Sequence, residues 1–424
     1  MKNMIQSLKG TRDFYPTEMA ARTWLYQVLR QISESFGYQE YDGPFLESIN
    51  LYAAKSGEEL VKEQSFVFPD RGGDLITLRP ELTPSLARMV AGRQGQLVYP
   101  LRWWSFGPFW RYERPQKGRT REFFQWNVDM IGANSPEADA ELIAILVTFF
   151  RQVGLGTEDV LVCINNRRLL DAQLSGMGIT PEMKPSISRW IDRRDKMNPE
   201  AWDAYGLESG LSAAQLVLMK EMLASQDLWQ QSDELVRLFS ALEALGVSAY
   251  VRYDPGVVRG LDYYTGTVFE AQDVRGDVRR AILGGGRYDN LLADVGGEPL
   301  PGVGFAMGDV VIGLILESKG LLPADLGKCP ADVIVTVFDQ ERQGASLSLA
   351  ASLRQAGLNV ICYPEAAKLP KQFKYADRLG IRLAAVIGPD EAANGTVTLK
   401  DLSSGDQTTV ARAEAAQHLK EMLG

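Results

Sequence analysis

The spacing of apolar residues predicts a long first helix followed by several strands. Apolar side chains recur at helical spacing from Leu25 to Phe36, with a start signal at Pro16 and a left-handed stop at Gly37. Strand-like segments follow at residues 38–44, 74–78, 97–112 and 122–131. An apolar helix is then expected from residue 140 to 153, started by Ser135. The first 165 residues therefore predict a unit that mixes helices and strands.

The pattern changes twice more along the chain. Residues 166–246 are mostly helical, with Ser212 and Ser232 as helix caps, and strands return in residues 247–316. This arrangement predicts a strand-rich domain interrupted by a helical insertion. Residues 317–330 lack periodicity and are expected to form a linker. Residues 331–424 alternate between strand and helix, which predicts a compact α/β domain with a largely parallel sheet.

A hairpin is predicted over residues 101–132, and its second arm alternates strictly. One face would carry Phe124, Trp126, Val128 and Met130, and the other Phe123, Gln125, Asn127 and Asp129. The loop between the arms carries Arg114, Lys117, Arg119 and Arg121. An ordinary half-exposed hairpin would explain the alternation but not the amides, acid and aromatic of the second face. A pocket-lining strand with an anion-binding loop explains both.

Composition narrows the chemistry that the 424 residues can perform. The only histidine is His418, near the C-terminus, so a histidine base, a Ser-His-Asp triad and a histidine-ligated metal are disfavoured. The three cysteines have no C-x-x-C spacing, which disfavours a zinc site and indicates a reducing cytoplasm. The net charge of −9 argues against indiscriminate nucleic-acid binding. We expect no membrane span and no secretory signal.

Three further clusters have both a structural and a functional interpretation. Arg259 precedes two tyrosines and a strand, and the glycine run at residues 284–286 permits either a close ligand approach or a tight turn. Glu81 precedes a helix capped by Thr83, where the helix dipole alone would favour an acid. A basic run in the last domain is either a solvated helix face or a phosphate-contacting patch; it comprises Lys368, Lys371, Lys374, Arg378 and Arg382.

At these residues the chain resembles histidyl-tRNA synthetase, over essentially its whole length. The resemblance is carried by KGTRDFYP, ITLRPELTPSLARM, RYERPQKGRTREFFQ, VVRGLDYYTGTVFE, GGGRYDNL, GVGFAMG, PKQFKYADRLG and VTLKDLSSGDQ. It implies a class II synthetase: an α+β catalytic domain built on an antiparallel sheet, with a helical insertion and a C-terminal α/β anticodon-binding domain. The implied catalytic parts are residues 1–165 and 247–316, the insertion is 166–246, the linker is 317–330, and the anticodon-binding domain is 331–424.

The family's reaction is ATP-dependent ligation of L-histidine to its tRNA through a histidyl-adenylate intermediate. The resemblance implies ATP as a substrate carrying Mg²⁺, no protein-bound zinc or other metal, a cytoplasmic homodimer, and no membrane partner. Activation is an attack on phosphorus by a carboxylate that is already ionised. It needs positioning and positive charge but no general base, which agrees with the single histidine.

The resemblance also implies roles for individual residues. Arg111 and Arg259 would be catalytic at the ATP α-phosphate. ATP would be bound by Arg111, Glu113, Arg119 and Phe123. Histidine would be bound by Glu81, Leu82, Thr83, Arg111, Gln125, Asp129, Arg259, Tyr263, Tyr264 and Tyr288. The α-amino end of histidine and its surroundings would be bound by Glu81, Thr83, Gln125 and Asp129, the histidine carboxylate by Arg111, and the imidazole by the three tyrosines. The tRNA would meet Arg114, Lys117, Arg121, Lys371 and Lys374.

Three positions depart from the family pattern, and one of them, Val311, points towards an alternative function. Val311 stands where the third motif places an arginine on the γ-phosphate, Leu82 where a glycine is common, and Asp129 where a glutamate is usual. The alternative is the non-aminoacylating paralogue that regulates ATP phosphoribosyltransferase in histidine biosynthesis. Arg259 and residues 331–424 disfavour it, because that paralogue typically lacks both the catalytic arginine and the anticodon-binding domain.

Overall fold

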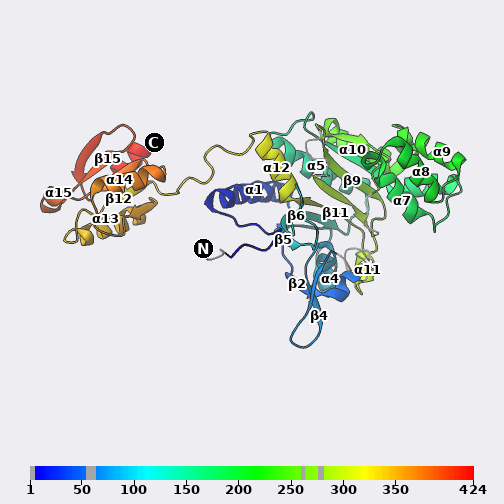
Figure 1. Ribbon diagram of the computed structural model, residues 1–424, viewed down its shortest axis with the longest axis horizontal. Coiled ribbons are helices and arrows are strands. Elements are labelled where there is room, and N and C mark those ends of the chain that lie inside the picture. Colours follow the sequence, from blue (N-terminus) through cyan, green and yellow to red (C-terminus); the bar gives the residue numbers. More distant parts are fainter. Residues whose placement is uncertain (1–4, 54–63, 259–262, 276–280) are drawn as a thin grey trace. The chain divides into compact units, whose positions relative to one another are not determined.

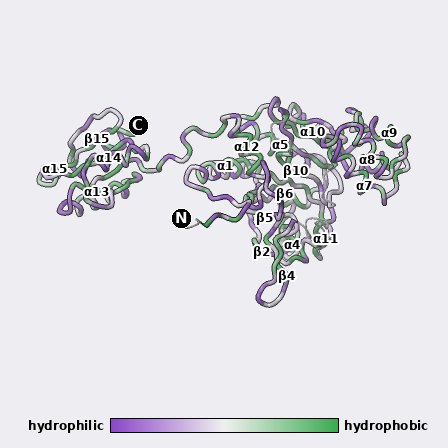
Figure 2. Tube along the Cα trace, in the orientation of Figure 1, coloured by the Kyte–Doolittle hydropathy of each residue, from purple (hydrophilic) through white to green (hydrophobic). Residues whose placement is uncertain are grey.

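The computed structural model describes residues 5–53, 64–258, 263–275 and 281–424 (Figure 1). Their contacts divide the chain into two units. The larger comprises Met1–Phe14 and Arg22–Leu322, and the smaller Tyr15–Ala21 and Pro323–Gly424. Hydrophobic and hydrophilic residues are interleaved along the chain (Figure 2). Within the described residues, no helix is both long and apolar enough to cross a membrane.

The first helix, α1 (Pro16–Ser35), has the predicted apolar stripe. Leu25, Val28, Leu29 and Ile32 are buried against the core of the larger unit. Gly37 follows with φ of +79°, a left-handed conformation that ends the helix at little steric cost. Helical spacing and stop signal are both confirmed.

The larger unit is built on a sheet of eight described strands, six of which form an antiparallel core. In spatial order the strands are β1 (Gln39–Glu40), β5 (Leu101–Trp110), β6 (Glu122–Ile131), β11 (Gly302–Gly308), β10 (Leu283–Tyr288), β9 (Thr267–Asp273), β7 (Val160–Asn166) and β8 (Val251–Tyr253). The two edge strands are parallel to their neighbours: β1 pairs with β5, and β8 pairs with β7. The predicted α+β domain on an antiparallel sheet is confirmed.

One face of this sheet is covered by apolar helices. The most extensively buried of them is α5 (Pro136–Gln152), and its N-cap residue Ser135 accepts a hydrogen bond from the Ala138 amide. Trp126, Val128 and Met130 of β6 point into this core together with α1 and α12 (Asp309–Ser318). The helix predicted from residue 140 thus begins four residues earlier, directly after its cap. The predicted linker also loses its first residues to α12.

The segment between β7 and β8 is helical, and its helices pack into two different cores. Its elements are α6 (Arg167–Gly176), α7 (Lys184–Asp192), η2 (Arg194–Lys196), α8 (Pro199–Glu208), α9 (Ala213–Ala224), η3 (Leu228–Gln231), α10 (Asp233–Ala244) and η4 (Ser248–Tyr250). The helices α6 to α9 share their own core, in which Trp190 and Trp202 stack at 4.3 Å. Each indole donates to the other's carbonyl. The last helix, α10, packs instead on α5 in the main core. Ser212 and Ser232 cap α9 and α10 as predicted.

A smaller three-stranded sheet precedes the predicted hairpin. In spatial order its strands are β2 (Leu46–Ser48), β4 (Leu75–Leu78) and β3 (Phe66–Pro69). The helices in the same part of the unit are α2 (Ile49–Ala53), α4 (Thr83–Arg93), η1 (Gln94–Gln96) and α11 (Leu291–Asp294). The prediction of Thr83 as the cap of α4 was wrong. Leu82 occupies the N-cap position and makes no side-chain cap, and Pro84 follows within the first turn. The strand predicted over residues 38–44 is limited to β1, because only two residues pair with β5.

The smaller unit has a five-stranded described sheet that is mixed. Its order is β13 (Val360–Cys362), β12 (Val333–Val335), β14 (Leu383–Val386), β15 (Thr396–Asp401) and β16 (Gln407–Ala411). Its helices are α13 (Gln343–Gln355), α14 (Leu369–Arg378), α15 (Pro389–Asn394) and α16 (Ala415–Leu423). The first three strands are parallel and the last two antiparallel, so "largely parallel" was only half right. The tight turn after Asp401 explains the antiparallel pairing of β15 with β16, because so short a connection permits only a hairpin.

Candidate active site

The face of the large sheet opposite the main core has a strip of very small residues. On β10 and β11, Gly284 pairs with Ala306, Gly286 with Gly304, and Tyr288 with Gly302. A Cβ atom at Gly304 would collide with the Asp129 carboxylate, and one at Gly302 with the Tyr288 ring. The glycine run at residues 284–286 also lies inside a strand, where a Cβ atom at Gly285 would meet the Phe269 ring and one at Gly286 the Tyr264 ring. Its function is close approach and not a tight turn.

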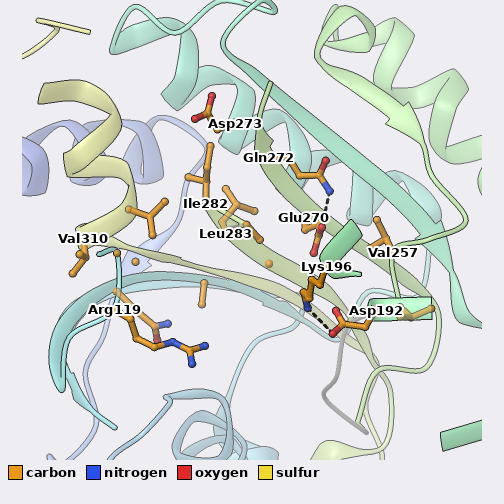
Figure 3. A pocket seen from close by; sticks show the side chains of 18 of the residues that line it. Arg119, Asp192, Lys196, Val257, Glu270, Gln272, Asp273, Ile282, Leu283 and Val310 are labelled. Carbon is orange, nitrogen blue, oxygen red and sulfur yellow. Dashed lines mark hydrogen bonds and ion pairs between the residues drawn. The ribbon is translucent and has the colours of Figure 1, made fainter. Parts of the chain in front are cut away.

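A cavity of about 1100 Å³ opens on this face (Figure 3). The hairpin supplies one wall, with Arg111, Glu113, Arg119, Phe123 and Gln125. All four residues predicted to bind ATP thus line one cavity. The prediction of a pocket-lining strand at β6 is confirmed.

The other walls come from segments that sequence reasoning did not assign. The η2 turn and its preceding helix contribute Asp192, Arg194 and Lys196, and β9 contributes Glu270, Gln272 and Asp273. Lys196 pairs with Asp192 at 2.6 Å, and Arg194 lies 3.8 Å from Asp254. The basic sequence around residue 194 was a usable signal. Residue 194 and β9 are far apart in the sequence, so the sequence alone did not predict that they line the same cavity.

Arg111 and Glu113 are held in place before any ligand binds. The Arg111 Nε donates to the carbonyl of Pro80 at 3.0 Å, and its guanidinium lies 5.3 Å from the Phe123 ring centroid. That contact is a cation–π interaction, which restrains the guanidinium over a ring that also lines the cavity. Glu113 forms an ion pair with Arg119. Any ligand that uses the Glu113 carboxylate must therefore compete with this ion pair.

At the position where the family pattern has an arginine, Val311 places an apolar side chain in the cavity wall. Val311 is 8% exposed, and it lines the cavity together with Val310 and Gly308. The preceding Asp309 accepts hydrogen bonds from the Phe124 amide at 2.8 Å and from Arg12 at 2.7 Å. Burial raises the pKa of Asp309. The start of α12 thus brings no positive charge of its own to the cavity.

Five of the residues predicted to bind histidine form a second, buried cluster, and these are Glu81, Asp129, Tyr263, Tyr264 and Tyr288. Tyr288 donates to Asp129 at 2.5 Å, and the Tyr263 hydroxyl lies 3.4 Å from the Glu81 carboxylate. The rings of Tyr263 and Tyr264 lie 4.9 Å apart, and those of Tyr263 and Tyr288 6.1 Å apart. Burial raises the pKa of Asp129 to about 7, although the Tyr288 hydrogen bond opposes the shift.

The two groups are continuous along β6. Phe123, Gln125 and Asp129 occupy one face of the strand, so the hairpin leads from the cavity to the buried cluster. Leu82 is buried and Thr83 is half-buried beside Glu81 at the start of α4. Arg259, predicted to be catalytic, lies outside the described residues.

The residues predicted to meet tRNA lie on exposed surfaces of the two units. Arg114 and Lys117 are exposed in the hairpin loop, whereas Arg121 is half-buried over the Tyr112 ring at 4.4 Å. Lys371 and Lys374 are exposed on α14, and Lys371 pairs with Glu365 at 3.1 Å. In the described part of the chain, no group of three or more acidic, cysteine or histidine side chains is arranged to hold a metal ion.

Comparison with known proteins bears on both units. The family model for histidyl-tRNA synthetase matches residues 10–309, and that for the anticodon binding domain matches residues 332–422. A histidine–tRNA ligase of Opitutus terrae is 38% identical over 434 residues, covering 99% of this chain and 98% of the relative. The chloroplastic/mitochondrial histidine–tRNA ligase of Arabidopsis thaliana is 39% identical over 412 residues, covering 95% and 84%.

A solved structure of histidyl-tRNA synthetase from Nostoc sp. PCC 7120 is similar throughout. Its TM-score is 0.81 at 28% identity, covering 99% of this chain and 100% of that one. The fold, the family models and the full-length relatives agree with one another. The chain belongs to the histidyl-tRNA synthetase family.

Proposed function

We propose that the cavity binds ATP and the buried cluster binds histidine, so that the two substrates meet at Gln125 and Arg111. Histidine–tRNA ligation is the activity of the family to which the chain belongs, and ATP is its energy-supplying substrate. The observation that carries the residue-level proposal is the shared face of β6. Phe123 and Gln125 line the cavity on that face, and Asp129 lies in the buried cluster.

In the proposed first step, the histidine carboxylate attacks the α-phosphorus and diphosphate leaves. Positive charge aimed at the phosphoryl oxygens stabilises this transition state. Arg111 is suited to the task because Pro80 and Phe123 already fix its guanidinium, which reduces the entropy lost on binding. Arg259 is proposed as the second arginine at the α-phosphate. Mg²⁺ would enter with ATP as part of that substrate.

We assign Glu113 to the adenine amino group, Phe123 to the ring face, and Arg119 to the outer phosphates. Arg119 is important because Val311 supplies no charge at the family's third-motif position. Glu81, Thr83 and Gln125 would bind the amino end of histidine. The resemblance implied that Asp129 binds the α-amino end of histidine. We assign it instead to the imidazole, because its partner Tyr288 belongs to the proposed imidazole pocket.

In the second step, the histidyl group would pass to the 3′ end of the tRNA. The exposed Arg114 and Lys117, with Arg121, would face the acceptor stem, and α14 of the smaller unit would contact the tRNA through Lys371 and Lys374. The regulatory paralogue is not favoured. Residues 332–422 match the anticodon-binding family model, and the full-length relatives are named as ligases.

A cytoplasmic homodimer completes the proposal. Large apolar side chains are exposed around the small sheet, among them Phe45, Leu46 and Leu75, and a second copy would cover such a surface. The three cysteines carry no disulfide in the structure, which suits a reducing compartment.

Histidine-dependent exchange of labelled diphosphate into ATP tests the assignment. Wild-type chain should catalyse exchange with histidine and not with threonine, proline or glycine. Arg119→Ala should lower kcat/KM for ATP about 10²-fold, because it removes a charge contact to the developing negative charge. Lys117→Ala is the matched control, since this cation lies on the same loop and does not line the cavity. Equal effects of the two substitutions would refute the role of Arg119.

A further inference from the structure

The Tyr41 hydroxyl is buried and has no hydrogen-bond partner among the described residues. Its residue lies directly after β1, where its amide donates to the Trp104 carbonyl at 2.9 Å. The ring packs on Trp103 with centroids 5.3 Å apart. Phenylalanine would fill the same space. The hydroxyl therefore adds nothing to this packing, and leaving it buried and unpaired costs free energy.

The hydroxyl lies beside the cluster assigned to the histidine side chain. Trp103, on which the Tyr41 ring packs, is the direct cross-strand neighbour of Asp129. The ring also packs against the apolar cluster that contains Tyr263, Tyr264 and Tyr288. Asp129 is the charge with the largest influence on the raised pKa of Tyr41, after burial itself. The Tyr41 ring thus packs beside the cluster that contains Asp129, and its hydroxyl has no hydrogen bond to that cluster.

A neutral imidazole needs one acceptor and one donor from its site. Its N–H must be accepted, and its other nitrogen must receive a hydrogen bond. An ionised Asp129 carboxylate can accept hydrogen bonds but cannot donate one, and it already accepts a hydrogen bond from the Tyr288 hydroxyl. A phenol with an unused O–H supplies the missing donor. Asp129 is also shorter than the family's glutamate, so further polar contact is needed on this side of the pocket.

We infer that Tyr41 is a histidine-binding residue whose hydroxyl donates a hydrogen bond to the imidazole of the substrate. This inference rests on the proposed assignment of Asp129 and Tyr288 to the imidazole. This role accounts for a buried hydroxyl that has no partner among the described residues. It is kept without a protein partner so that it is available to the ligand.

Tyr41→Phe in the full chain tests this inference by diphosphate exchange and urea unfolding. The KM for histidine should rise about tenfold, equivalent to about 1.4 kcal/mol of binding. The KM for ATP should stay unchanged, and the unfolding midpoint should stay the same or increase, because an unpaired hydroxyl has been removed. Tyr250→Phe is the matched control. Its buried hydroxyl donates to the Leu155 carbonyl at 3.1 Å, so it should lose stability and keep its KM for histidine.

Two results would overturn the inference, and a third separates it from its premise. An unchanged histidine KM in Tyr41→Phe would mean that the hydroxyl does not contact the substrate. A lower unfolding midpoint with equal losses for histidine and ATP would mean a structural role. Asp129→Asn examines the premise: if it leaves the histidine KM unchanged, the assignment of the whole cluster fails. If it raises that KM and Tyr41→Phe does not, only the role of Tyr41 is refuted.

Discussion

Asp129 combines a charge with an environment that disfavours it. The carboxyl is almost fully buried between the Tyr288 hydroxyl and the backbone of Gly304, and burial raises its pKa from 3.8 to about 7. An acid with a raised pKa keeps its proton in the folded state at a pH where the unfolded chain has lost it. It therefore stabilises the fold fully below pH 4, and this contribution is lost as the pH rises through 7.

Asp129→Asn should remove this dependence on pH. The asparagine oxygen still accepts from Tyr288, and no charge has to be buried. The free energy of unfolding of the variant, relative to wild type, should rise between pH 5 and pH 8 by ~2.7 kcal/mol, because about two pKa units lie between pH 5 and the folded pKa of about 7 and each counts 1.36 kcal/mol. Urea titrations of both proteins at the two pH values measure the difference. A difference that is constant with pH would show that the Asp129 pKa is not raised.

At the scale of elements, the most accurate prediction is that of β6, the strand whose two faces have the most different surroundings. The alternation from Glu122 to Ile131 predicted β6 to the residue, because one face is core and the other is a cavity wall. The start of α4 was misplaced by one residue, since no side chain caps it and the sequence signal of Thr83 had no structural counterpart. The cavity wall at Arg194 and the hydroxyl at Tyr41 were missed because long-range packing alone brings them to the site.

The signature GGGRYD also shows how elements are joined. Arg287 of β10 is buried and donates at 2.5 Å to Asp139 of α5, and it also bonds the carbonyls of Ala133 and Ser135. The pair fixes the strand that carries Tyr288 to the helix behind the sheet. On the same helix, Glu137 forms a two-bond pair with Arg237, but both side chains are about half exposed. One helix thus has a buried and an exposed arginine–carboxylate pair.

Asp139→Asn and Glu137→Gln compare these two pairs directly. Asp139→Asn leaves the buried Arg287 guanidinium with only its longer contact to Asp289, at 3.4 Å, and should lower the free energy of unfolding by about 3 kcal/mol. Glu137→Gln breaks a solvent-screened pair and should cost less than about 1 kcal/mol. Thermal or urea unfolding gives both values. If the two costs are equal, the buried pair does not hold β10 to α5.

At the scale of the whole molecule, charge is unevenly distributed. The chain has a net charge of −9, yet α14 and the residue before it expose several cations against one acid, Asp377. An acidic protein repels RNA except where such a cluster is locally dominant, so the surface restricts where tRNA can bind. Two family models match separate parts of the chain, and this cluster lies in the part matched by the anticodon-binding one. Binding of tRNA and activation of histidine should therefore be separable by substitution.

Lys374→Ala is the sharpest test of that separation, because Lys374 is exposed and lies in the middle of α14. Loss of one phosphate contact should raise the KM for tRNA several-fold and reduce the slope of log affinity against log salt by about 1. Histidine-dependent exchange, which involves no tRNA, should not change. Lys420→Ala is the control, since Lys420 is an exposed cation on α16 of the same unit. An equal loss in both variants would mean that only the total charge of the unit matters, and a loss of exchange in Lys374→Ala would mean that α14 also acts on the active site.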